Sequence, residues 1–372
     1  MELVNVLTKL IGISMVVAAV GCSSAIPIEV EPTRRADLAV RSKATSNPAT
    51  RIPSTITQVQ IKPAPNENST SIALFDAHNH MPKGLTAEKI ISVMDQENIA
   101  RMILMGKGGP TSRDVTTLQA YDQFPDRIVP FIGLNGYTAK NFTPEFFDYL
   151  DRQFGDGEFL GMGELLSRHY SFSTGALGTT LKAPDFDFSM DQPIVHDLMC
   201  LASKHDVVLM VHMEAEDETI LALERALADN PDAKVIWAHQ THLKTFGGST
   251  KEHTHKADPS GIGRLLSEYP NLYADIAVGH ELHHWTKGDG KIPEPWKKLY
   301  ENYSDRFIVG YDMPFLEIWN SEKPIKFRTS LIRNWLSQLK PETQKKFAVA
   351  NIEHILGDKP LKTKKCSFLT RD

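Results

Sequence analysis

Two histidines with one residue between them, His78 and His80, stand at the end of an apolar run. Residues 72–80 read Ile-Ala-Leu-Phe-Asp-Ala-His-Asn-His. Alternate side chains of a β-strand point to the same face, so both imidazoles are expected to lie close enough to hold one metal ion. Taken alone, the pair favours a strand end that carries two solvated histidines, because an H-x-H pattern often occurs by chance.

Four later apolar runs also end in residues of types that bind metals. These runs are 159–164, 207–212, 234–239 and 306–312, and they end in Glu164, His212, His239 and Asp312. Imidazole and carboxylate groups suit zinc and other divalent first-row metals. The five strand ends together predict one metal site. Its candidate ligands are His78, His80, Glu164, His212, His239 and Asp312.

The order of these residues resembles that of the amidohydrolase superfamily, especially its amidohydrolase-related branch and the TatD-type hydrolases. The resemblance implies that H-x-H, Glu, His, His and Asp stand on strands one, four, five, six and eight of a (β/α)8 TIM barrel, an α/β fold of the metal-dependent hydrolase type. It covers roughly residues 71–357, a length that fits the about 250 residues or more of such a barrel.

The elements that must position these residues alternate along the chain. Alternation of strands and helices implies a parallel sheet, and eight repeats imply that the sheet closes into a barrel. Strands are expected near 72–76, 100–105, 127–135, 159–164, 207–212, 234–239, 272–278 and 306–312. Helices are expected near 86–95, 114–123, 142–154, 196–202, 218–230, 259–266, 294–303, 327–339 and 341–356. Every candidate ligand then falls at the C-terminal end of a strand, where such barrels carry their catalytic groups.

The chemistry expected of this site is hydrolysis of an amide, ester or lactone bond in a small molecule. One or two divalent metal ions, with zinc preferred and Mn, Fe or Co possible, would lower the pKa of a bound water and polarise the scissile group. Asp312 is the expected general base and proton shuttle, as the resemblance also implies. With a single ion, His78, His80, His212 and Asp312 are the expected ligands, and His239 turns to catalytic activation of the substrate.

Three further residues near strand ends are assigned to the substrate. Arg168 and His169 follow strand four, and His280 lies after strand seven. Arg168 is suited to pair with a carboxylate or phosphate through two hydrogen bonds, and it is equally compatible with a surface position. Glu164 decides the number of ions, because the resemblance implies a bridging carboxylate at this strand end only in binuclear members.

Two other functions remain open from the sequence. Amidohydrolase-related proteins include metal-dependent non-oxidative decarboxylases of unsaturated or aromatic acids, which use the same ligands. A non-catalytic surface lipoprotein that binds a metal or a partner is the alternative from another class. A nuclease is disfavoured, because a formal net charge of −5 offers no basic track for phosphates. The preferred partner is therefore a small molecule and not a nucleic acid, and the oligomeric state is left open.

The first 22 residues predict export. An apolar run at 10–21 is shorter than the ~20 residues of a membrane-spanning helix and fits the core of a signal peptide. Ala19-Val20-Gly21-Cys22 resembles a bacterial lipobox, which implies lipidation of Cys22 and a membrane anchor. A plain secretory signal and an uncleaved N-terminal anchor are the alternatives, and all three place the protein outside the cytoplasm, in the periplasm or at the cell surface.

Two further segments flank the barrel. Residues 23–70 are rich in Ser, Thr, Pro, Ala and Arg, which predicts a disordered tether because few large apolar side chains are present to bury. Residues 358–372 form a basic C-terminal tail. The expected layout is therefore a signal segment, a tether, one catalytic barrel at 71–357 and a tail.

Overall fold

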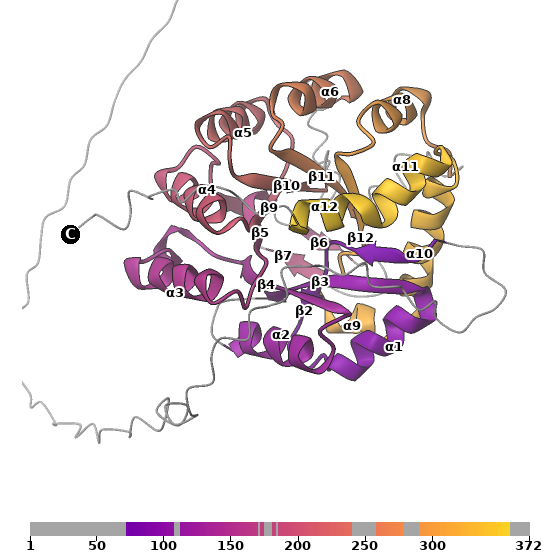
Figure 1. The fold of residues 1–372 in the computed structure, drawn as a ribbon, viewed down its shortest axis with the longest axis horizontal. Coiled ribbons are helices and arrows are strands. Elements are labelled where there is room, and N and C mark those ends of the chain that lie inside the picture. Colours follow the sequence, from indigo (N-terminus) through magenta and orange to yellow (C-terminus); the bar gives the residue numbers. More distant parts are fainter. Residues whose placement is uncertain are drawn as a thin grey trace, which may run out of the picture. The chain divides into compact units, whose positions relative to one another are not determined.

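The computed structural model describes residues 72–107, 112–169, 172–174, 181–183, 185–239, 258–277 and 290–357. The predicted signal segment with Cys22, the tether, His280 and the tail lie outside these ranges. Within them, strands and helices alternate along the chain (Figure 1).

Parallel strands form the centre of the fold. They are β1 (Leu74–Asp76), β3 (Ile99–Lys107), β4 (Ile128–Asn135), β5 (Gly161–His169), β9 (Val208–Met213), β10 (Lys234–Ala238), β11 (Leu272–Ala277) and β12 (Phe307–Gly310), each paired with the next in this order. All seven of these pairings are parallel. The sheet returns to its first strand, because the Ala77 N–H donates to the Val309 carbonyl at 2.9 Å. The predicted (β/α)8 barrel is confirmed.

The seam between β12 and β1 is narrow. A Cβ atom added to Gly310 would lie 2.5 Å from the Cβ of His78, a distance that real Cβ atoms do not show. The absence of a side chain at Gly310 therefore lets β12 approach the segment that carries the histidine pair. On the same seam, the Asp312 N–H donates to the His78 carbonyl at 2.8 Å.

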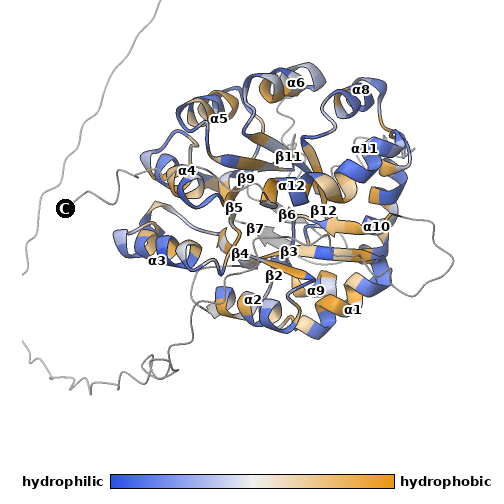
Figure 2. Cartoon of the chain, in the orientation of Figure 1, coloured by the Kyte–Doolittle hydropathy of each residue, from blue (hydrophilic) through white to orange (hydrophobic). Residues whose placement is uncertain are grey.

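Helices cover the outside of the barrel, and their apolar faces pack on the strands. In Figure 2 the hydrophilic residues of these helices lie mainly on their outer sides. The first helix shows the local cause: Thr86 caps its N-terminus by accepting from the Lys89 N–H at 3.3 Å, and its apolar side chains recur at helical spacing. The helices are α1 (Ala87–Glu97), α2 (Ser112–Gln123), α3 (Pro144–Gly155), α4 (Pro193–His205), α5 (Asp217–Asp229), α6 (Pro259–Glu268), α8 (Glu294–Asn302), α9 (Leu316–Trp319), α10 (Glu322–Leu336), α11 (Pro341–Lys345) and α12 (Asn351–Gly357).

Inward-facing side chains of the strands fill the barrel, as alternation along each strand requires. They form a buried apolar cluster of Phe75, Ala77, Ile103, Met105, Val129, Phe131, Val208, Met210, Ile236, Ala238 and Ile308, joined by Ile352 and Ile355 of α12. The Lys234 ammonium donates to the Ile355 carbonyl at 2.7 Å, and the Asn351 amide donates to the Phe307 carbonyl at 2.7 Å. Since Lys234 and Phe307 begin their strands, α12 closes the N-terminal end of the barrel.

The segment after Glu164 contains strands beyond the predicted strand 159–164. Strand β5 continues to His169, and β8 (Phe186–Asp187) pairs with it in the antiparallel sense. Two further short strands, β6 (Phe172–Thr174) and β7 (Leu181–Ala183), pair with each other. The polar residues 167–169 stay in a strand because the returning chain supplies ladder partners that the local sequence does not reveal.

Two other features concern the described helices and Cys200. No helix in the described ranges has the length and apolar character needed to span a bilayer. Cys200 in α4 is disulfide-bonded, and its partner lies outside the described residues.

Candidate metal centre

The histidine pair is held in place by two buried polar side chains of the same segment. Asp76 accepts hydrogen bonds from the backbone N–H groups of His78 at 3.2 Å and Tyr311 at 2.9 Å. Asn79 accepts from the N–H groups of His80 at 2.9 Å and Met313 at 3.2 Å. Both side chains therefore join the end of β1 to the end of β12. The short strand β2 (His80–Met81) follows and pairs with β3.

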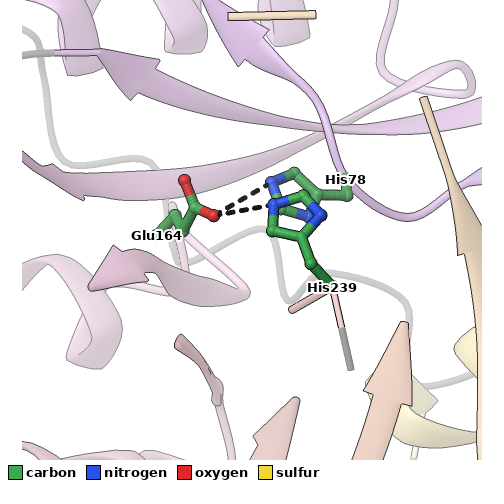
Figure 3. A group of neighbouring side chains, drawn as sticks. All are labelled: His78, Glu164 and His239. Carbon is green, nitrogen blue, oxygen red and sulfur yellow. Dashed lines mark hydrogen bonds and ion pairs between the residues drawn. The ribbon is translucent and has the colours of Figure 1, made fainter. Parts of the chain in front are cut away.

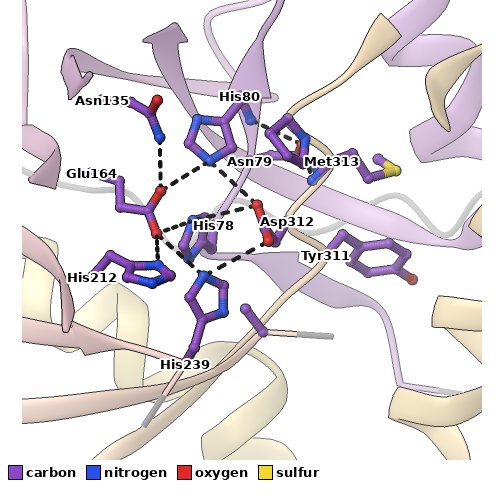
Figure 4. A network of polar contacts seen from close by, with 12 residues as sticks. His78, Asn79, His80, Asn135, Glu164, His212, His239, Tyr311, Asp312 and Met313 are labelled. Carbon is purple, nitrogen blue, oxygen red and sulfur yellow. Dashed lines mark hydrogen bonds and ion pairs between the residues drawn. The ribbon is translucent and has the colours of Figure 1, made fainter. Parts of the chain in front are cut away.

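This join brings Asp312 next to both histidines. Nε2 of His80 lies 3.3 Å from Oδ1 of Asp312 and 3.6 Å from Oε2 of Glu164. Nε2 of His78 lies 3.8 Å from Oδ1 of Asp312 and 3.7 Å from Oε1 of Glu164. The two imidazoles and the two carboxylates thus face one another across one small volume (Figure 4).

Glu164 occupies the middle of the group. Its Oε1 lies 3.0 Å from Nδ1 of His212 and 3.2 Å from Nε2 of His239. Its Oε2 accepts a hydrogen bond from the Asn135 amide at 3.1 Å. Figure 3 shows the rings of His78 and His239 directed at the same carboxylate oxygen. The structure thus brings together the six side chains predicted as ligands, and their binding of a metal stays a prediction.

The members of this centre differ in exposure. The side chains of His78 and His80 are fully buried, and that of Glu164 is 5% exposed. The Asp312 side chain is 20% exposed, the most open of the six. Asp312 is therefore the candidate ligand with a side open to an incoming molecule.

Burial and charge act against each other on the pKa values of the centre. Burial would raise the pKa of Glu164, but hydrogen bonds from His212 and His239 hold it well below its usual value. The pKa of Asp312 is also lowered, because the surrounding imidazoles outweigh its burial. For His78, burial would lower the pKa, but Asp275 and the facing carboxylates raise it to about 10. The centre therefore holds ionised carboxylates that attract positive charge.

The donor atoms fit a divalent metal ion. Nε2 of His78 and both ring nitrogens of His80 are buried and have no hydrogen-bond partner within the described residues, which is costly unless a ligand uses them. Two compact groups offer ligand atoms within 4.8 Å of one another. One group is His78, Glu164 and His239, and the other is His78, His80 and Asp312. Nitrogen and oxygen donors at this density are typical of zinc and related cations.

Two of the candidate ligands have a left-handed backbone. The φ angle is 50° at His239 and 43° at Asp312, a region that costs about 1–2 kcal/mol for a residue with a side chain. Such strain persists where surrounding contacts hold it, and it is concentrated at functional sites. At both positions the chain turns sharply as it leaves the strand, and the side chain is directed at the centre.

One contributor was not predicted from the sequence. Asp275 in β11 is fully buried, and its Oδ2 lies 2.7 Å from Nδ1 of His78. Its Oδ1 accepts from the N–H groups of His239 at 2.8 Å and Ala277 at 3.0 Å. An aspartate between apolar neighbours in a buried strand is a signal of a partner, because an unpaired buried carboxylate is costly. The sequence does not tell which partner it has.

The remaining predicted residues have different surroundings. His212 reaches Glu164 but belongs to neither compact group. The guanidinium of Arg168 donates to Asp185 at 2.7 Å and to the Phe186 carbonyl at 2.9 Å, so it is engaged within the protein. The ring of His169 lies against His212, with centroids 4.8 Å apart, which places it beside the centre. Nothing is described for His280 or Cys22.

Comparison with known proteins gives a family and a fold. A family model described as amidohydrolase matches residues 109–357. No curated protein sequence matches the chain. Among solved structures, an amidohydrolase from Burkholderia multivorans with bound zinc is similar, with a TM-score of 0.51 and 11% sequence identity over 78% of this chain and 100% of that chain.

Two further solved structures are similar at lower scores. They are 2,6-dihydroxybenzoate decarboxylase from Rhizobium, with a TM-score of 0.47 and 13% identity over 77% of this chain and 99% of that chain, and 4-oxalomesaconate hydratase from Rhodopseudomonas palustris, with a TM-score of 0.48 and 12% identity over 76% of this chain and 95% of that chain.

Proposed function

The chain belongs to the amidohydrolase family, whose members are metal-dependent enzymes, and from this premise we propose that it hydrolyses an amide, ester or lactone bond of a small molecule. The observation that carries the proposal is the convergence of histidines and two carboxylates at the C-terminal ends of the barrel strands. In barrels of this kind, that end carries the active site.

His78, His80 and Asp312 would hold the first metal ion, because their ligand atoms form one compact group. A bound divalent cation supplies Lewis acidity, which activates water and polarises the bond to be cleaved. Zinc suits these donors best, and Mn, Fe and Co suit them as well. Glu164 lies between this group and His239, so it is the residue through which a second ion would be accommodated.

Asp312 is the proposed general base. It is ionised at neutral pH because the imidazoles lower its pKa, and its side chain has the most open face of the six. Its Oδ2 lies 3.7 Å from Nε2 of His239. Asp312 is therefore able to take a proton from a nucleophile that attacks from the open side, and His239 is placed to stabilise the carboxylate on its other side.

The proposal is tested by metal analysis of the purified protein together with the variant Asp312→Asn. We expect bound divalent metal in the wild type and hydrolysis of at least one class in a panel of amides, lactones and aryl esters. General acid–base catalysis contributes about 10²- to 10⁴-fold, so Asp312→Asn should lose turnover by that factor while remaining folded. Asp229→Asn, at a side chain that is 68% exposed, is the matched control.

Other outcomes of the same experiment contradict the proposal. Carbon dioxide release from aromatic or unsaturated acids without hydrolysis of the panel would establish the decarboxylase instead. Full turnover in Asp312→Asn would remove Asp312 as the base. A wild type that binds metal but turns over no compound of either set would point to the non-catalytic surface protein.

We also propose that the protein is exported and anchored to a bacterial membrane through Cys22. The disulfide at Cys200 supports an oxidising compartment, because disulfides are rare in cytosolic proteins. Fractionation of cells that express the full chain tests this proposal. The wild type should sediment with membranes and Cys22→Ser should become soluble, whereas the same distribution for both would rule out the lipid anchor.

A further inference from the structure

One carboxylate, that of Asp275, contacts two candidate ligands that come from different strands. Its Oδ2 pairs with the ring of His78 after β1, and its Oδ1 pairs with the backbone of His239 after β10. We propose that Asp275 is a positioning residue that fixes the His78 ring and the His239 main chain together, and thereby determines the metal affinity of the centre. This inference rests on the proposed function, since it assumes that the centre binds a metal.

The contact with His78 selects which ring nitrogen faces the centre. A carboxylate 2.7 Å from Nδ1 accepts a hydrogen bond, so the one proton that the ring would keep on binding a metal resides on Nδ1. The lone pair then resides on Nε2, the buried atom that has no hydrogen-bond partner in the described residues. Nε2 is also the nitrogen that faces Glu164 and Asp312. A carboxylate behind a ligand histidine fixes its tautomer and increases its basicity toward a metal.

The contact with His239 acts on the backbone. His239 has a φ of 50°, a conformation that needs external support in a residue with a side chain. The Asp275 oxygen supplies this support by accepting the His239 N–H at 2.8 Å. The same oxygen accepts the Ala277 N–H of its own strand at 3.0 Å, which fixes the orientation of the carboxylate. The turn that directs His239 at Glu164 therefore depends on a side chain from the neighbouring strand.

Asp275 is placed to position ligands and not to bind the metal itself. It is fully buried, both of its oxygens are already occupied by donors, and it belongs to neither compact group of ligand atoms. Asparagine at this position keeps the shape but offers one acceptor oxygen where two are used. The amide NH2 of the asparagine would face one of the two donors, either the Nδ1–H of His78 or the N–H of His239, and would accept no hydrogen bond from it. At least one of the two contacts is therefore lost.

The test measures metal binding without turnover. Apo protein is titrated with zinc against a chelator, and the visible spectrum of the cobalt-loaded protein reports ligand geometry. We expect Asp275→Asn to lose about 10- to 100-fold in zinc affinity, as is typical for such supporting residues, and to show an altered cobalt spectrum. Asp114→Asn is the matched control, because Asp114 is 1% exposed and also accepts a backbone N–H, that of Gly133 at 3.0 Å, away from the centre.

The outcomes separate the inference from the proposed function. Zinc affinity and a cobalt spectrum equal to those of the wild type in Asp275→Asn would overturn the inference, whatever the melting temperature of the apo protein. That result leaves the proposed function intact. A wild type that binds no divalent metal would overturn both.

If Asp275→Asn does not fold, the wild type decides the question. Nitrogen spectra of zinc-loaded protein labelled with ¹⁵N-histidine distinguish the two ring tautomers. The inference expects a metal-bound ring that is protonated at Nδ1 and whose proton exchanges slowly with solvent. If every metal-bound ring is protonated at Nε2, Asp275 does not hold Nδ1 of His78 and the inference is wrong.

Discussion

Two buried groups of polar side chains in this barrel affect their carboxyl groups in opposite directions. In the candidate metal centre, the imidazoles lower the pKa values of Glu164 and Asp312 despite their burial. In the Asp114 cluster, between α2, β4 and α3, burial raises the pKa of Asp114 to about 7. That carboxyl accepts hydrogen bonds from the Gly133 N–H at 3.0 Å and the Tyr149 hydroxyl at 3.3 Å, and both donors are neutral.

Burial alone therefore raises the pKa of these carboxyl groups, and facing opposite charges reverse that effect. Asp76 shows the same rule inside the metal centre itself. It lies two residues before His78, yet its pKa is raised to about 7 because burial dominates and its hydrogen bonds come mainly from neutral groups. A carboxyl group kept ionised in such surroundings is one that faces cations, which supports Glu164 and Asp312 as metal ligands.

The largest effect is expected from Glu164→Gln, which removes the ionised carboxylate at the middle of the candidate metal centre. Losing one partner of a buried charge group costs about 3–5 kcal/mol, which corresponds to about 10²- to 10³-fold or more in metal affinity. Chelator competition on purified protein measures this loss. Glu97→Gln, at a glutamate that is 8% exposed in α1, should bind metal as the wild type does. Equal affinity in Glu164→Gln and the control would remove Glu164 from the site.

Asp114→Asn tests the raised pKa of the Asp114 carboxyl through the pH dependence of protein stability. The folded-state pKa of about 7 exceeds the usual 3.8, so between these values the folded protein keeps a proton that the unfolded chain releases. The stability contributed by the neutral carboxyl is complete below pH 4 and is lost as the pH rises through 7. Asn cannot ionise, so the variant should gain relative stability over this range, by at most about 4 kcal/mol.

Urea denaturation of Asp114→Asn and wild type at pH 5 and pH 8 measures this gain. The difference in free energy of unfolding between variant and wild type should favour the variant more at pH 8 than at pH 5. A difference that does not change with pH would mean that Asp114 has an ordinary pKa in the folded protein.

Added metal should stabilise the folded protein through the candidate metal centre and not through the Asp114 cluster. A ligand at 100 times its dissociation constant stabilises the folded protein by about 2.7 kcal/mol. We expect this increase in wild type and in Asp114→Asn alike, and its loss in Glu164→Gln at the same zinc concentration. Thermal unfolding with and without zinc gives the comparison. An increase that depends on Asp114 would show that the two groups are coupled.

The smallest effect is expected at the hydroxyl groups beside Asp114. Tyr149→Phe removes a hydrogen bond worth about 1 kcal/mol to a neutral acceptor and about 1.5–3 kcal/mol to a charged one, so its cost should be larger at pH 8 than at pH 5. Tyr137→Phe is the control, because the buried Tyr137 hydroxyl has no hydrogen-bond partner in the described residues. Tyr137→Phe should be neutral or slightly stabilising at both pH values.

Much of the fold was predictable because its signals are local. Each strand of the barrel is an apolar run, each helix has apolar residues at helical spacing, and the candidate ligands stand where runs end. His239 and Asp312 could be assigned to one centre because the C-terminal ends of parallel strands meet at one rim. This reasoning needs only the order of elements and no side-chain contact.

The parts that were not predicted depend on contacts between distant segments. Asp275 stands 197 positions from His78 along the chain, and the strand around it reads like any buried strand. Arg168 was assigned to the substrate, but its guanidinium donates a hydrogen bond to Asp185, the residue before β8. The local sequence shows which residue types are able to do chemistry. The tertiary structure decides which of these side chains already bind other residues of the protein.

The helix that closes the floor of the barrel has a consequence for how the protein is made. Ile352 and Ile355 complete the apolar interior, yet they leave the ribosome after every strand they cover. Until then the growing chain presents an open apolar ring to solvent, a state prone to aggregation. The barrel therefore seals only once its last helix has emerged, and until then the growing chain depends on chaperones to stay free of aggregation.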